Sequence, residues 1–120
     1  MSLQQIYLVV ISVGLIPISM GYGLSPKKVL SKMFGFNVND NGAHIFRAVM
    51  GLYFGMIALW VIGIINPLYT NAAILASIFF MLGLASGRLL SFFYEGQVSL
   101  LLKVYFVLEV VIGVIGIILL

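Results

Sequence analysis

The chain has 120 residues, which is long enough for one domain, and its composition excludes the class of water-soluble globular proteins. Hydrophobic residues make up 63% of it and charged residues only 8%, whereas a soluble domain carries about 25% charged residues to cover its surface. The net charge is +3, but this excess does not predict nucleic-acid binding, because the cations flank apolar segments instead of forming a polar face.

Four apolar segments are each long enough to cross a bilayer as a helix, which takes about 20 residues. They cover residues 3–23, 44–65, 72–93 and 98–120. The first has neither the basic start nor the cleavage site of a secretory signal, so we expect it to be retained. The sequence therefore predicts an all-α, integral membrane four-helix transmembrane bundle that forms a single domain over residues 1–120.

The connection between the first two spans predicts a short fifth helix over residues 26–34. Ser25 and Pro26 are typical of a helix start, and Gly35 is typical of a helix end. Lysines alternate with apolar residues in between: Lys27, Lys28 and Lys32 with Val29, Leu30, Met33 and Phe34. This pattern predicts an interfacial helix with its lysines at anionic lipid headgroups and its apolar residues toward acyl chains.

The side-chain cations predict the orientation of the chain in the membrane. Lys27, Lys28, Lys32 and Arg47 flank the first connection, and Arg88 and Lys103 flank the third. In a protein with four spans these two connections share a side. Because loops rich in lysine and arginine stay in the cytoplasm, we expect both termini outside the cytoplasm of a multi-pass protein in the inner (plasma) membrane.

Three charged residues lie inside the predicted spans, where an isolated charge costs several kcal/mol. Arg47 and Arg88 are about one helical turn from the cytoplasmic ends of the second and third spans, and Glu109 is near the middle of the fourth. Helical spacing adds polar neighbours on the same faces. The resulting candidate cluster consists of Arg47, Arg88, Glu109, Tyr105, Ser91 and Glu95. It is either a structural network or a site for an anion, a lipid headgroup or a proton.

Small residues form two stripes at helical spacing, one on the second span and one on the third. Gly51 and Gly55 lie on one span, and Gly83 and Gly87 lie on the next. Such pairs let a second helix approach closely, so these faces are candidates for homo-oligomer contacts.

The polar strings of the chain resemble those of a bacterial membrane family catalogued as domain of unknown function 4345. The resemblance lies in residues 46–52 (FRAVMGL) and 87–91 (GRLLS), together with Glu95, Gly96 and Glu109, and it extends over nearly the whole chain. Gln97 stands where the family leads us to expect proline. The resemblance implies four membrane helices and no activity.

Three functions remain open at this point. The first is a non-enzymatic membrane protein that binds a lipid or small amphiphile at the arginine and glutamate cluster. The second is a small oligomeric transporter or channel, for which proton linkage through Glu109 is one alternative. The third is an assembly subunit of a larger membrane complex. We expect no enzyme activity, cofactor, metal site or nucleic-acid partner, because the sequence has no nucleophile beside a base, no phosphate loop and no metal-ligand spacing.

Overall fold

The computed structural model describes residues 1–35 and 37–120, and it is helical nearly throughout. Within these two ranges there are four long helices and two short ones: α1 (Leu3–Leu24), α2 (Pro26–Phe34), α3 (Asp40–Ile65), η1 (Pro67–Tyr69), α4 (Thr70–Glu95) and α5 (Leu100–Leu119). The long helices α1, α3, α4 (with η1) and α5 are each long and apolar enough to cross a membrane. The predicted fold class, an all-α membrane protein with four long helices and a short helix between the first two, is confirmed.

Local sequence determines where the helices begin and end. The Ser2 side chain accepts a hydrogen bond from the backbone N–H of Gln5, and the Gln5 side chain accepts one from Ser2 in return, which starts α1. Pro26 occupies the first turn of α2, and Gly35 ends it with a left-handed backbone (φ 73°) that glycine adopts without strain. The bounds of α2 are therefore those that the serine, proline and glycine predicted.

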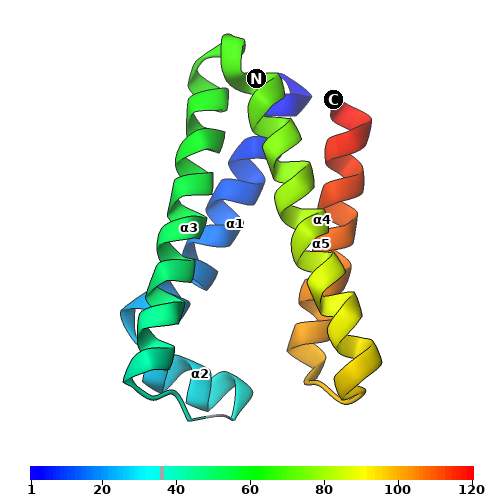
Figure 1. Cartoon of the computed structure of the whole chain (residues 1–120). Helices are drawn as coiled ribbons and strands as arrows, with labels where there is room; N and C mark the ends of the chain where they lie inside the picture. Colours follow the sequence, from blue (N-terminus) through cyan, green and yellow to red (C-terminus); the bar gives the residue numbers. More distant parts are fainter. Residues whose placement is uncertain (36) are drawn as a thin grey trace.

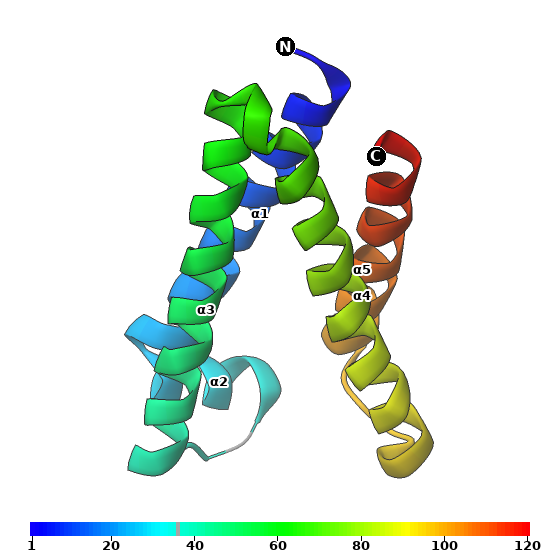
Figure 2. The same cartoon turned by 45° about the horizontal axis from the view of Figure 1, so that its top comes forward.

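The four long helices form two pairs, α1 with α3 and α4 with α5 (Figure 1). The pairs lie close together at the end that carries both chain termini, which we call the terminal end. They diverge toward the opposite end, which carries α2 and the α4–α5 turn and which we call the α2 end (Figure 2). The bundle is therefore closed at one end and open at the other.

Hydrogen bonds from the start of α1 hold the terminal end together. The Gln4 amide donates to the backbone carbonyl of Leu119 at 2.8 Å, and the Gln5 amide donates to that of Ile64 at 3.0 Å. These bonds join α1 to the ends of α5 and α3 and satisfy carbonyl groups that a helix end leaves unpaired. Gly63 allows the α3–α4 hairpin to close, because a Cβ there would lie 2.5 Å from the Cβ of Ala73.

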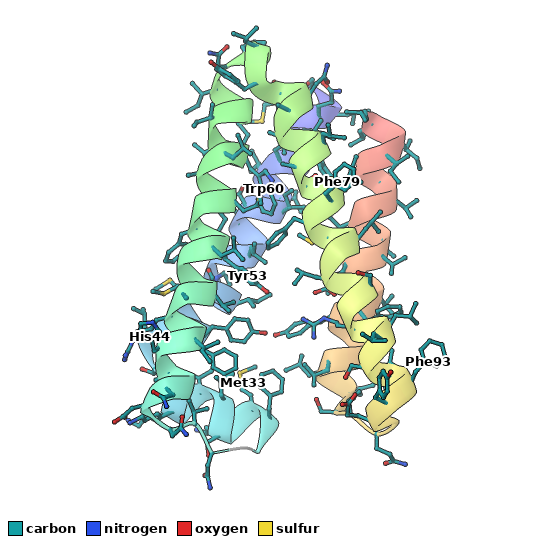
Figure 3. The ribbon with its side chains drawn as sticks, viewed as in Figure 1. Met33, His44, Tyr53, Trp60, Phe79 and Phe93 are labelled. Carbon is teal, nitrogen blue, oxygen red and sulfur yellow. The ribbon has the colours of Figure 1, made fainter. Side chains whose placement is uncertain are left out.

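An aromatic row fills the space between α3 and α4 in the closed half. Phe80 packs edge-on against Tyr53 and Trp60, with ring centroids 5.3 and 5.8 Å apart. Figure 3 shows Trp60 between the two helices and Tyr53 directed from α3 toward α4. Trp60 has no exposed surface. This row marks the boundary between the packed core and the open half.

The helix α2 folds back beneath α1 and α3 (Figure 1). Its Leu30 is only 1% exposed, so the prediction that Leu30 faces acyl chains is wrong. The physical reason is the single-residue link at Ser25, which turns the apolar face of α2 against its own neighbours in the chain. Met33, in contrast, is exposed.

Candidate functional site

A pocket of about 210 Å³ lies where the two helix pairs begin to diverge. We call it the cleft. One wall comes from α1 and the other from α4 and α5, and Tyr53 of α3 completes the lining. Its lining is mostly apolar and consists of Val10, Ile11, Gly14, Leu15, Ile18, Tyr22, Tyr53, Met81, Leu84, Arg88, Tyr105, Leu108, Glu109 and Ile112.

An ion pair between α4 and α5 provides the polar side of the cleft. The Arg88 Nε–H donates to both oxygens of Glu109, at 2.8 Å to Oε1 and 3.1 Å to Oε2. The side chains of Arg88 and Glu109 are 22% and 10% exposed. Glu109 lies about 14 Å from the start of α5, near the middle of the helix, so the pair removes the cost of an isolated carboxylate at that depth.

Only one edge of the Arg88 guanidinium is used by the ion pair. Arg88 is half-buried and lines the cleft, and the Tyr22 hydroxyl of α1 is a further hydrogen-bond partner for its guanidinium. Its Cζ atom lies 5.6 Å from the centroid of the Tyr105 ring, a distance at which a cation is attracted to the ring face. The guanidinium is thus held by Glu109, Tyr105 and Tyr22 at the wall of the cleft.

Two further tyrosines from the opposite helix pair approach the ion pair. Tyr22 of α1 and Tyr53 of α3 both line the cleft, and their rings pack edge-on with centroids 6.0 Å apart. The cleft therefore has a polar part with one cation, one carboxylate and three phenols. The rest of its wall is aliphatic apart from Gly14.

The predicted cluster does not come together as a whole. Arg88, Glu109 and Tyr105 meet in the cleft, whereas the Arg47 Nε–H donates to the carbonyl of Gly23 near the end of α1, at 3.2 Å. The hydrogen bond of Arg47 is therefore made to α1 and not to the ion pair. Arg47 lines a different pocket near α2.

Ser91 and Glu95 form their own contact, with the Ser91 hydroxyl 2.8 Å from the Glu95 carboxylate on the exposed surface of α4. Neither residue lines the cleft.

The three lysines predicted to bind lipid headgroups lie on α2. Lys27 forms an exposed ion pair with Asp40, and Lys28 and Lys32 make no ion pair with any described residue.

The closed half of the molecule limits the cleft toward the terminal end. The Tyr7 hydroxyl lies 2.8 Å from the Ser77 hydroxyl and donates to the carbonyl of Ile112 at 3.1 Å. Gly113 and Gly116 of α5 pack so tightly on α4 that a Cβ at either would lie within 3 Å of Leu82 or Ile78. The cleft is thus bounded by packed protein on that side.

Sequence reasoning did not find Tyr22, Tyr53 or the aliphatic wall of the cleft. A tyrosine deep in an apolar span was the one available signal, because its hydroxyl needs a polar partner there. Among residues 1–35 and 37–120 no group of three or more His, Cys, Asp or Glu side chains is placed to hold a metal ion.

The comparisons with known proteins agree with the resemblance noted above. The family model described as Domain of unknown function (DUF4345) matches residues 3–120. Neither the comparison with curated proteins nor that with solved structures gave a match. Because the family model covers nearly the whole chain, the protein belongs to this family.

Proposed function

We propose that this member of the DUF4345 family is a non-enzymatic membrane protein that binds a lipid or small amphiphile in the cleft. The observation that carries the proposal is the amphipathic lining, in which the Arg88 guanidinium and three phenols adjoin an aliphatic wall. Ligand sites commonly combine an apolar wall with a few polar groups that fix orientation. A polar head would bind Arg88, and an apolar tail would lie along α1.

The size of the cleft limits how much of a ligand it takes. Its volume of about 210 Å³ corresponds to about seven water molecules at ~30 Å³ each. It therefore holds one polar group with part of one chain, and the remainder of a longer lipid would extend into the bilayer. Gly14 lies on the α1 wall, and a Cβ there would meet nothing within 4 Å.

Binding is favoured over transport by the closed terminal end. A transporter needs a path for its substrate to both sides of the membrane, but Tyr7, Gly113 and Gly116 pack tightly beyond the cleft. A binding protein requires only that the cleft is open on one side. A proton-linked transporter that uses Glu109 would have to separate these contacts during each cycle.

The proposed location is the inner membrane, with the α2 end in the cytoplasm. This orientation is supported by the placement of the cations, because α2 and the α4–α5 turn lie at the same end (Figure 1).

A homo-oligomer also stays a prediction. Gly51, Gly55, Gly83 and Gly87 are exposed, and a Cβ at any of them would meet nothing within 4 Å, so these stripes are open for a second copy or another subunit.

The test is native mass spectrometry of the protein extracted from membranes in a neutral detergent. We expect a co-purifying amphiphile bound at one per chain. The Gly14→Leu substitution fills the cleft and should remove the adduct, and Arg88→Gln should weaken it. Gly51→Leu is the matched control, because it adds the same side chain on an open face outside the cleft. Equal adducts on Gly14→Leu and Gly51→Leu would contradict the proposal.

A further inference from the structure

A second pocket, of about 400 Å³, lies at the α2 end where α1, α2 and α3 meet. We call it the corner pocket. It shares no lining residue with the cleft, so it is a separate site. Its lining consists of Leu24, Ser25, Pro26, Lys27, Lys28, Asp40, Ala43 and Arg47.

Arg47 is held in place at this corner. Its Nε–H donates to the Gly23 carbonyl, which belongs to the last turn of α1. That bond fixes one edge of the guanidinium and satisfies a carbonyl at a helix end. Within the described residues no hydrogen bond is made by the two terminal amino groups of Arg47, so its planar donor edge is available to a ligand.

The other charged groups of the corner pocket leave it positive. Lys27 forms an ion pair with Asp40, and Lys28 has no carboxylate partner among the described residues. Three cations and one carboxylate give the lining a net charge of +2. The Ser25 hydroxyl adds a neutral polar group, and the Ser25 side chain makes no cap hydrogen bond to α2.

We propose that the corner pocket binds a phosphate group through Arg47 and Lys28, with Lys27 and Ser25 alongside. A guanidinium edge and an ammonium group are the side-chain donors best matched to phosphate oxygens. The phosphate could belong to the headgroup of an anionic lipid or to a soluble phosphate. Both have the same recognition chemistry, and the experiment below distinguishes them.

The proposal differs from a general attraction of the lysines to an anionic membrane. Lys32 lies on the same short helix as Lys28 but does not line the corner pocket. General attraction would make the two lysines equivalent, at about 1 kcal/mol each, which is about fivefold in affinity. In a specific phosphate site, substitution of Lys28 weakens the affinity for the ligand, whereas substitution of Lys32 does not. Asp40 gives a second criterion for a specific site, because its carboxylate repels an anion and is paired with Lys27.

The experiment measures the affinity of the full chain, in a neutral detergent, for short-chain phosphatidylglycerol and for inorganic phosphate. We expect Lys28→Gln and Arg47→Gln each to weaken binding about fivefold or more, and Asp40→Asn to strengthen it by a similar factor. Lys32→Gln should leave affinity unchanged. Lys28 is exposed, so Lys28→Gln tests the site even if Arg47→Gln disturbs the α1–α3 contact.

The outcomes separate the two sources of phosphate. Displacement of the lipid by inorganic phosphate would show that the pocket also takes soluble phosphate, and binding of the lipid without such displacement would assign it to lipid headgroups. The proposal is overturned if neither probe binds, if Lys28→Gln and Lys32→Gln weaken binding equally, or if Asp40→Asn weakens it. The cleft variant Gly14→Leu should not change any of these affinities, which keeps this test independent of the proposed function.

Discussion

The Arg88–Glu109 ion pair shows how one residue determines the state of another at this depth. Glu109 is nearly buried, and both of its oxygens accept from the same N–H of Arg88. A charge that loses its partner in an apolar environment is costly, whereas the loss of both charges together can be nearly neutral. The two side chains therefore have to be considered as one unit.

This coupling predicts a non-additive result in a double-mutant cycle. We expect Glu109→Leu to lower the free energy of unfolding by about 3 kcal/mol, because it leaves the Arg88 cation without its carboxylate partner. Glu109→Gln, which keeps a hydrogen-bond acceptor, should cost about 1 kcal/mol. The double variant Arg88→Leu, Glu109→Leu should be more stable than Glu109→Leu alone. The measurement is unfolding of each variant in detergent, and additive losses would show that the pair is not coupled.

Arg47 illustrates what residue-level reasoning could not decide. Helical spacing placed it on a defined face of its own span, and the cost of a buried charge predicted a partner. The partner it found is a backbone carbonyl at the end of α1, not Glu109. Spacing determines directions around one helix, but the distance between two helices depends on how the pairs diverge, and the sequence does not encode that in any single residue.

At the scale of the elements, glycine has two different roles in this chain. At four glycines a neighbouring helix comes so close that an added Cβ would lie less than 3 Å from one of its side-chain atoms: Gly23, Gly63, Gly113 and Gly116. The exposed stripes on α3 and α4 have open space instead. Sequence spacing alone does not distinguish Gly113 and Gly116 from the exposed stripes, since both follow the pattern of small residues at helical intervals.

The difference between the two sets predicts opposite effects of the same substitution. Gly63→Ala should destabilise the protein by about 1–3 kcal/mol, because its Cβ would meet the Cβ of Ala73 at 2.5 Å. Gly83→Ala should be neutral or stabilise it by up to about 1 kcal/mol, because alanine favours the helix and meets nothing. Thermal unfolding in detergent checks both, and equal destabilisation would mean that the Gly83 face is packed in the protein as isolated.

The bounds and the surroundings of α2 were not equally predictable. Its start at Pro26 and its end at Gly35 follow from local backbone preferences, which act within a few residues. The burial of Leu30 depends on which helices α2 folds against. An apolar face on a short helix predicts that something apolar covers it, but lipid and protein satisfy that requirement equally well.

At the scale of the whole molecule, the candidate site depends on the divergence of the two helix pairs. The sequence identified Arg88 and Glu109 because charges in apolar spans are rare and need partners. Tyr22 and Tyr53 were missed because their role comes from the pair α1 and α3 facing the pair α4 and α5 across the cleft. That arrangement results from hydrogen bonds and glycine contacts at the terminal end, which hold one end closed.

The orientation of the whole molecule gives the last prediction. The chain has no cysteine, so single cysteines report accessibility without a background signal. We expect a cysteine at Asn71, exposed at the terminal end, to react with a membrane-impermeant thiol reagent added to intact cells. A cysteine at Asn41, exposed at the α2 end, should react only after the membrane is permeabilised, because the proposed orientation places the cationic end in the cytoplasm.

A cysteine at Gly55 is the control, because it lies inside α3 and on a face open to lipid, where a charged reagent does not enter. Reaction of the Asn41 variant in intact cells, with the Asn71 variant protected, would reverse the orientation. The cleft and the corner pocket would then both open toward the non-cytoplasmic side, and the ligands to be tested would change from those of the inner leaflet to those of the outer one. If the two binding proposals hold, orientation thus decides from which side of the membrane ligands reach Arg88 and Arg47.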